Sequence, residues 1–231
     1  MQIAILGSGS DGNGYLIQTE KEWLLIECGI RSVELMKTIN FNVRNVCGCI
    51  ISHVHSDHVQ YVKDYLKYGF PIYMTPESRA ETPVLCMERM KVQKIGGFEV
   101  IPFQVPHNET DCDGFLIRHP EFGSLLYITD AEMCPYDMSK AGINHVMIEC
   151  NYSIDYLEMT EVNKNHILCG HMELQTCKRF LRTIYSEQLQ SIGLIHLSQV
   201  NGDPDRFMNE VQDEFPFTKV WVAEKNKRIE V

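Results

Sequence analysis

The sequence predicts an α/β protein whose β-sheets are covered by helices. Short apolar runs bounded by polar or turn residues recur in both halves of the chain, and segments with helical periodicity are interspersed among them. The length of 231 residues suits one domain with a substantial core, and 44% apolar with 23% charged residues is ordinary for a soluble globular protein. We therefore expect a single domain over residues 1–231.

The apolar runs place the individual elements. Strands are expected at Ile3–Leu6, Tyr15–Gln18, Trp23–Ile26, Val46–Ser52, Ile72–Met74, Val92–Ile95, Val100–Val105, Phe115–Arg118, Leu125–Thr129, His145–Glu149, Ile192–Leu197 and Lys219–Val222. Helices are expected at Ser32–Thr38, Val59–Lys67, Leu174–Tyr185 and Pro204–Glu214. The helix Leu174–Tyr185 has one apolar stripe at helical spacing, which indicates packing on the core.

Composition narrows the class of protein. The formal net charge is -10, which argues against a partner with a long phosphate backbone, although Lys164 and the group Lys178, Arg179 and Arg182 could form a local basic patch. The nine cysteines are an odd number without zinc-knuckle spacing, which favours free thiols in a reducing compartment. No apolar run approaches the length of a membrane span, and the N-terminus reads as a strand and not as a signal peptide.

The most informative segment is Ile50–Gln60, which packs three histidines and an aspartate directly behind an apolar strand. A loop at a strand end can turn several of these side chains toward one point. Imidazole nitrogens and carboxylates are the ligands that a divalent ion such as zinc prefers. The cluster consists of His53, His55, Asp57 and His58.

Three further ligand-type residues lie at or near the ends of predicted strands. His107 follows the run Ile101–Pro106 and shares one side of the strand with Ile101, Phe103 and Val105. Asp130 is the first charged residue after Ser124–Thr129, and His196 lies near the end of Ile192–Ser198. Each residue alone is more often structural than functional. Their recurrence beside the dense cluster favours a metal site with seven ligands.

The order His-x-His-x-Asp-His, a lone His, an Asp after a strand and a late His resembles the metallo-β-lactamase superfamily of binuclear hydrolases over essentially the whole chain. The segments Leu6–Asn13, Glu149–Asn151, Gly170-His171 and His196–Asn201 resemble its YycJ/WalJ-like branch. That branch is similar to phage anti-Pycsar cyclic-nucleotide phosphodiesterases and, more distantly, to transfer-RNA 3′-processing enzymes. The resemblance implies a four-layer αββα sandwich (the metallo-β-lactamase fold) with two metal ions, zinc or manganese, at one rim.

The resemblance also implies a role for each ligand. His53, His55 and His107 would hold the first metal ion, Asp57, His58 and His196 the second, and Asp130 would bridge them. Two dications bring more positive charge than two aspartates neutralise, so the site would attract an anionic substrate and lower the pKa of a bound water. Phosphodiesters fit such a site. Asp57 and His171 are the candidate catalytic residues.

Some positions leave alternatives open. Glu27-Cys28-Gly29 stands where the family commonly has Asp-x-Gly, so Glu27 is either an acceptor for a ligand histidine or a change in packing. His171 either contacts phosphate, acts as a general acid, or is structural. The glycine-rich loop 7–14 either cradles phosphate or lets strands approach the site. Ser8, Asn13, Asn151 and His171 are candidate substrate-binding residues.

The leading functional hypothesis is a metal-dependent phosphodiesterase that opens a small cyclic nucleotide. The first alternative is a YycJ-like exonuclease acting on DNA or RNA. Hydrolysis of thioesters, lactones or lactams and a non-catalytic metal-binding domain are further alternatives, because one fold hosts many reactions. We expect a cytoplasmic protein (in the host cytoplasm if phage-encoded) without membrane contact, and we leave a homodimer open.

Overall fold

The computed structural model describes residues 1–157 and 167–231, and its strands form two mixed sheets. The first sheet has the order β14-β1-β2-β3-β4-β5-β6. These strands are β1 (Gln2–Gly7), β2 (Gly14–Gln18), β3 (Trp23–Ile26), β4 (Val46–Ile50), β5 (Ile72–Met74), β6 (Leu85–Cys86) and β14 (Arg228–Glu230). The second has the order β13-β12-β11-β10-β9-β8-β7. These are β7 (Gln93–Ile95), β8 (Phe98–Val105), β9 (Cys112–His119), β10 (Gly123–Ile128), β11 (His145–Glu149), β12 (Ser191–Ile195) and β13 (Lys219–Val222).

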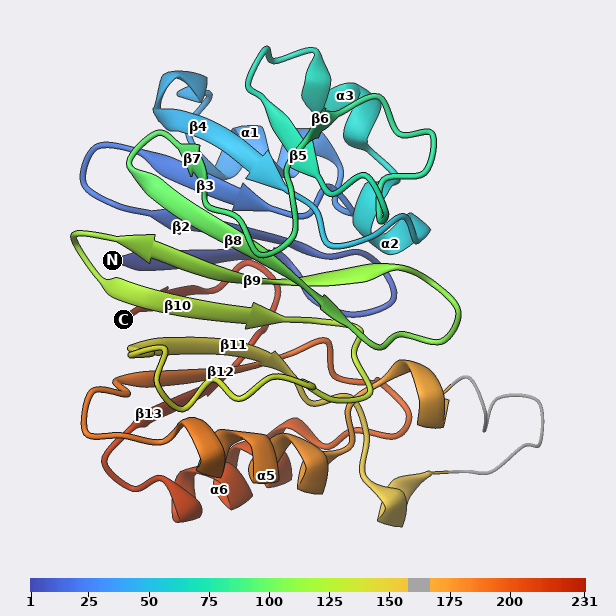
Figure 1. The fold of residues 1–231 in the computed structure, drawn as a ribbon, viewed down its shortest axis with the longest axis vertical. Coiled ribbons are helices and arrows are strands. Elements are labelled where there is room, and N and C mark those ends of the chain that lie inside the picture. The colour runs from blue at the N-terminus through green and yellow to red at the C-terminus, as the bar shows by residue number, and fades with distance from the viewer. Residues whose placement is uncertain (158–166) are drawn as a thin grey trace.

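Helices cover the outer face of each sheet, which gives four layers (Figure 1). On the first sheet lie α1 (Ser32–Thr38), α2 (Ser56–Val59) and α3 (Val62–Leu66), with a 3-10 turn at Val43–Asn45. On the second lie α5 (Leu174–Ile184) and α6 (Pro204–Glu214); a further 3-10 turn covers Ile154–Tyr156. The αββα sandwich predicted from the resemblance is therefore confirmed. No helix within residues 1–157 and 167–231 is both long and apolar enough to cross a membrane.

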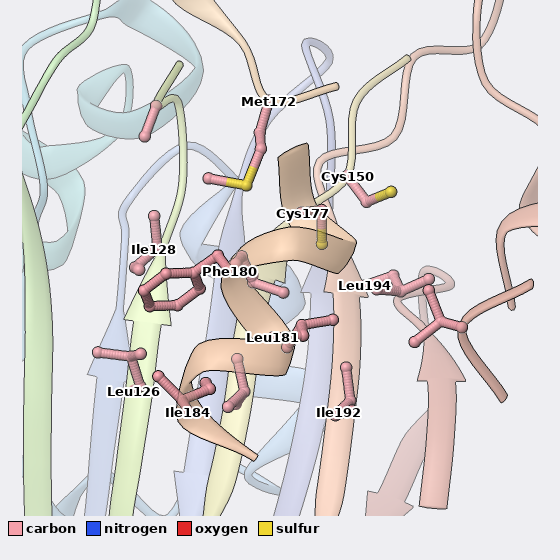
Figure 2. Packing of buried hydrophobic residues seen from close by; sticks show 14 of the residues in the cluster. Leu126, Ile128, Cys150, Met172, Cys177, Phe180, Leu181, Ile184, Ile192 and Leu194 are labelled. Atoms are coloured by element: carbon pink, nitrogen blue, oxygen red, sulfur yellow. The ribbon is translucent and has the colours of Figure 1, made fainter. Parts of the chain in front are cut away.

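Apolar side chains fill each of the three spaces between layers. Between the sheets, Ile5, Ile26, Phe115 and Tyr127 belong to one buried cluster. A second cluster joins α1 and α3 to the first sheet. A third joins α5 and α6 to the second sheet (Figure 2), where α5 buries the apolar stripe that its sequence predicts: Leu174, Cys177, Phe180, Leu181 and Ile184. Burial of this kind is the main stabilising contribution to the fold.

Strand directions decide where the site lies. β3, β4 and β5 run parallel in the first sheet, and β10, β11, β12 and β13 run parallel in the second. β8 pairs antiparallel with β9, which pairs antiparallel with β10, so β8 and β10 point the same way. The carboxyl ends of these strands meet at one rim of the sandwich, the right-hand side in Figure 1.

Most predicted elements are present, with two corrections. The strand predicted at Val46–Ser52 ends at Ile50, because the chain leaves the sheet to form the histidine loop. The helix predicted at Val59–Lys67 is α3, which starts only at Val62; α2 precedes it, and the two are separated where the N–H of Tyr61 donates to the carbonyl of Cys28. The short strands β6 and β14 were not predicted.

His145 provides a test of how burial affects stability. It is 1% exposed at the start of β11 and hydrogen-bonds Ser191 Oγ through Nδ1 at 2.9 Å. Burial lowers its pKa to about 4, assisted by the amino terminus and opposed by the Phe122 carbonyl. Between pH 4 and its ordinary value near 6.5, the unfolded chain therefore binds a proton that the folded chain does not.

We predict that this imidazole costs stability as pH falls through that window, on the order of 3 kcal/mol by pH 4. His145→Gln removes the titration, so its free energy of unfolding relative to wild type should improve steadily from pH 6.5 to pH 4. Urea titrations of both proteins across this range measure the difference. A difference that does not change with pH would show that His145 titrates equally in both states.

Candidate metal centre

The cluster at the rim begins where β4 ends. After Ile50 the chain leaves the sheet and turns. His55 directly precedes the first residue of α2, and its carbonyl accepts a hydrogen bond from the N–H of His58 at 2.9 Å. Asp57 and His58 are in α2, so one short helix presents both. His53 and His58 are fully buried, whereas the Asp57 side chain is 18% exposed.

The first ligand-type group contains His53, His55, His107 and Asp130, each of which offers one atom within 4.8 Å of the others. His107 Nε2 lies 3.1 Å from His55 Nδ1 and 4.0 Å from Asp130 Oδ2. His107 Nδ1 is bonded at 2.7 Å to the Gly170 carbonyl, which fixes the ring orientation. Nε2 is thus the nitrogen that faces the cluster.

The second group contains Asp57, His58, Asp130 and His196 within the same 4.8 Å limit. His58 Nε2 lies 3.2 Å from Asp57 Oδ2 and 3.0 Å from Asp130 Oδ2. Asp130 belongs to both groups, and its Oδ2 is also 3.3 Å from His53 Nε2. The structure thus brings together all seven residues that the sequence pointed to, although their assignment to individual metal ions stays a prediction.

Three residues at the rim adopt left-handed backbone conformations. Glu27 (φ 66°) follows β3, Asp130 (φ 46°) follows β10, and His196 (φ 53°) follows β12. This region is uncommon for residues other than glycine and costs roughly 1–3 kcal/mol for each residue. Each of the three follows a strand that ends at the cluster, and the left-handed conformation turns its side chain toward the other ligand-type residues.

The electrostatics of the cluster suit a divalent cation. Burial and the charge of His58 lower the pKa of His53, and burial lowers the pKa of His107 to about 4, with His53 adding to the effect against the attraction of Asp130. Neutral imidazole is the form that binds a metal. Burial opposes ionisation of Asp130, but the charges of His196 and His58 hold its pKa well below the usual range.

Two buried nitrogen atoms point to the same conclusion. Among the described residues, His53 Nε2 and His196 Nε2 are shielded from solvent and make no hydrogen bond, although His53 Nε2 lies 3.3 Å from Asp130 Oδ2 and His196 Nε2 lies 3.5 Å from Asp57 Oδ2. Buried polar atoms almost always have a partner, and an unpaired one costs free energy. Both nitrogens lie within the two groups, so an ion bound there would satisfy them. The residues present therefore fit a divalent metal site.

Glu27 contacts the ligand set, which bears on the two alternatives that its sequence left open. Its carboxylate is fully buried, lies 3.2 Å from His58 Nδ1, and accepts from the hydroxyl of Tyr127 at 3.2 Å and from the N–H of Ser52 at 3.3 Å. Such a carboxylate orients a ligand ring and raises its basicity. We propose the acceptor role for Glu27.

The glycine-rich loop packs tightly against the cluster. A Cβ on Gly29 would lie 1.6 Å from the Asp57 carbonyl oxygen, and one on Gly12, whose φ is 137°, would lie 2.4 Å from the Gly29 carbonyl oxygen. Only glycine permits this approach. This geometry supports the second interpretation of the loop, that its glycines let chain segments approach the site closely.

The three polar residues suggested as substrate contacts lie behind the ligands. Asn13 Nδ2 donates to Asp57 Oδ2 at 3.1 Å. Ser8 Oγ accepts from the N–H of His196 at 2.8 Å, and Asn151 Nδ2 donates to the His196 carbonyl at 2.8 Å. Asn13 and Asn151 are buried. Substrate binding by these side chains stays a prediction, and their hydrogen bonds lead us to propose that they position ligands.

Glu149 is a residue to which sequence reasoning assigned no role. It is fully buried at the end of β11, and its Oε1 lies 2.8 Å from His171 Nδ1 and 2.9 Å from His196 Nδ1. It forms a third ligand-type group with Asp130, His171 and His196. The sequence pattern that could have identified Glu149 is a carboxylate directly after the apolar residues of a strand, the same pattern that identified Asp130.

The comparisons with known proteins agree with this geometry. A family model described as "Anti-Pycsar protein Apyc1" matches residues 1–68. The chain is 26% identical over 222 residues to exodeoxyribonuclease YycJ of Bacillus anthracis, covering 87% of this chain and 84% of that protein. It is 28% identical over 83 residues to anti-Pycsar protein Apyc1 of Paenibacillus xerothermodurans, covering 31% of this chain and 33% of that protein.

Among solved structures, the metallo-β-lactamase fold protein YhfI of Bacillus subtilis superposes with a TM-score of 0.77 at 18% identity, covering 100% of this chain and 99% of that one. A likeness at this identity establishes the fold. Together with the sequence relatives, it confirms the resemblance to the metallo-β-lactamase superfamily and to its YycJ/WalJ branch.

We predict two metal ions per wild-type chain and the loss of one in Asp57→Ala, together with loss of turnover and a preserved fold. Asp57 is the better probe than His58, because removing His58 would leave the buried Glu27 carboxylate unpaired and cost stability as well. Elemental analysis, an activity assay and circular dichroism on protein purified without chelator measure the three effects. A wild-type stoichiometry at or below one under added zinc or manganese would refute the binuclear assignment.

We predict that Glu27→Gln weakens metal binding about 10- to 100-fold, because the amide accepts from His58 Nδ1 more weakly than the carboxylate does and so lowers the basicity of the ligand ring. Competition with a chelator of known affinity measures this change. Glu22→Gln is the matched control, since Glu22 Oε1 lies 3.3 Å from His119 Nε2, outside the cluster. Equal affinities for the two variants would mean that Glu27 contributes only packing.

Proposed function

We propose that this metal-dependent hydrolase of the metallo-β-lactamase fold is a binuclear phosphodiesterase that opens a small cyclic nucleotide. The observation that supports it most strongly is the pair of ligand-type groups that share Asp130. Beside them lies a cavity of about 130 Å³ whose lining includes Ser10, His55, Asp57, Asp130 and His171. A space of this size suits the phosphoryl group of one phosphodiester.

The histidine-rich ligand set favours zinc, with manganese as the alternative. Two bound dications would supply Lewis acidity for a phosphoryl oxygen and would lower the pKa of a bound water toward neutrality. The protein's own contribution is to hold seven ligands rigidly and to exclude bulk water from Asp130 and the buried histidines.

His171 is our candidate for the general acid. It lines the cavity beside Asp57 and Asp130, and its Nδ1 is engaged by Glu149 Oε1 at 2.8 Å. Because Nδ1 is engaged, Nε2 is the ring nitrogen that can give a proton to the leaving oxygen as the phosphorus–oxygen bond breaks. Water supplies the other substituent on phosphorus, and the products are the two halves of the phosphodiester or one linear nucleotide.

The alternative that a specific observation favours is an exonuclease. The relatives that match over most of the chain are named exodeoxyribonucleases. Both functions break a phosphodiester bond at the same site. They differ in whether the substrate continues as a polynucleotide on either side of the scissile phosphate. No structural observation favours thioester or lactone hydrolysis, or a non-catalytic role.

The distribution of charge favours the small substrate. The predicted basic patch is largely compensated: Lys178 Nζ lies 3.1 Å from Glu210 and 3.5 Å from Glu214, and Arg182 also pairs with Glu214. Lys164 lies outside the described residues. Because the net charge is -10, the chain has little surplus positive charge with which to follow a long phosphate backbone.

A cytoplasmic location and a homodimer stay predictions. A small nucleotide substrate fits a cytoplasmic location. Size-exclusion chromatography with light scattering would determine whether the protein is a homodimer.

We predict that His171→Ala lowers kcat about 100-fold or more while the metal content stays at the wild-type value. The pH profile of kcat should also lose its dependence on the ionisation of an acid. Elemental analysis accompanies the kinetics, because loss of a metal ion would make His171 a ligand. An unchanged kcat would make it structural.

We predict hydrolysis of a cyclic mononucleotide to a linear nucleotide, with a rate that changes little between low and physiological salt. A protein that follows a long backbone loses about 10³–10⁵ in affinity between roughly 50 and 200 mM salt, because each phosphate contact releases counterions. Chromatography of reactions with cyclic nucleotides, single-stranded DNA and RNA separates the cases. Efficient, salt-sensitive digestion of DNA with cyclic nucleotides left intact would establish the exonuclease.

A further inference from the structure

A second, larger cavity adjoins the candidate metal centre. It has a volume of about 660 Å³ and lies between the segment that follows Asp130 and the outer side of α5. His171 lines both this cavity and the one at the ligands, so the two spaces meet at that residue. Small-molecule sites typically enclose about 300–1,000 Å³, so a nucleoside can be accommodated here.

The walls of this cavity offer flat and apolar surface. Tyr136 packs edge-to-face against Phe103 with ring centroids 5.5 Å apart, and Tyr152 is 3% exposed. Phe180 also lines the cavity, but it is 8% exposed because its ring is directed toward the second sheet near Leu126 and Ile128 (Figure 2). Aromatic and apolar walls of this kind suit a planar ring.

Most charged side chains among the described lining residues are carboxylates, which accept hydrogen bonds. The Glu173 carboxylate is used at the start of α5, where it accepts from the N–H groups of Gln175 and Thr176, and Asp137 accepts from the N–H of Ser139. Glu132 adds a third carboxylate only two residues from Asp130. Among the described residues that line this cavity, Arg179 is the only Lys or Arg.

We infer that this cavity binds the nucleobase of the substrate, a neutral planar ring that carries N–H donors. The inference rests on the proposed phosphodiesterase function and extends it. If His171 protonates the leaving oxygen, the nucleoside attached to that oxygen lies on the His171 side of the phosphate, where the cavity opens. The Glu132 carboxylate then accepts from N–H groups of the base.

The same lining argues against a polynucleotide continuing through this space. Among the described lining residues, three carry a carboxylate (Glu132, Asp137 and Glu173) and one carries a guanidinium, Arg179. A phosphate seated among them would be repelled, whereas an uncharged base would not. The cavity therefore fits a substrate whose only phosphodiester is the one at the ligands.

The test compares nucleoside 5′-monophosphates with inorganic phosphate, using calorimetry on the zinc-loaded protein. Thr176→Trp and Thr183→Trp place bulk into the cavity from α5, and Gln175→Trp is the matched control because Gln175 is exposed on the same helix and does not line the cavity. We expect each cavity variant to weaken binding of at least one nucleoside monophosphate 10-fold or more. Binding of inorganic phosphate should equal that of wild type in all three variants.

The measurement needs no turnover, so it is independent of the proposed function. Failure of wild type to hydrolyse any cyclic nucleotide would refute the proposed function alone. Nucleoside monophosphates that bind both cavity variants as tightly as Gln175→Trp would refute the base-binding cavity alone. If one cavity variant fails to fold, the other decides. For a wild type that does hydrolyse cyclic nucleotides, the cavity variants should raise KM with little change in kcat.

Discussion

The constraint on which the site depends is that buried carboxylates and buried histidines must compensate one another. Glu27, Asp130 and Glu149 are each at most 2% exposed, and each lies within 3.3 Å of at least one histidine nitrogen. An isolated carboxylate in such a place would cost several kcal/mol. Each contact therefore orients a ligand ring and also makes the burial of its partner tolerable, so the loss of one member affects the others.

For the carboxylates and histidines to compensate one another, their side chains must be placed accurately, and the backbone conformation places them. The left-handed conformations of Glu27, Asp130 and His196 are strained, and the surrounding sheets hold them. Main-chain groups contribute as well, because the N–H of Asn13 donates to the Asp57 carbonyl at 2.7 Å and the N–H of Cys28 to the His58 carbonyl at 2.8 Å. Segments from β1–β2 and β3 thus fix α2 before any ion binds, which reduces the reorganisation that binding requires.

Sequence patterns predicted the buried strands well, because a strand such as β10 shows its apolar run locally. They did not predict β6 or β14, whose pairing depends on neighbours distant in the sequence: Leu85–Cys86 pairs with β5 and Arg228–Glu230 with β1. The seven ligand-type residues could be found because each follows a strand or lies in one dense loop. Glu149 shows the same local pattern, but its contacts with His171 and His196 depend on β11 lying between β10 and β12, which no local pattern reports.

In the base-binding proposal, the segment after β10 connects substrate recognition to the ligand set. It carries Asp130, which belongs to both groups, and Glu132, which lines the larger cavity. The N–H of Glu132 donates to the Pro106 carbonyl at 3.0 Å, directly before His107 in the chain. A base that shifted Glu132 would therefore shift Asp130 and His107 together. Asp130 at the ligands and Glu132 at the proposed base site are only two positions apart in the chain. Substitutions in this segment could therefore change the preferred substrate while the same ligand set is kept.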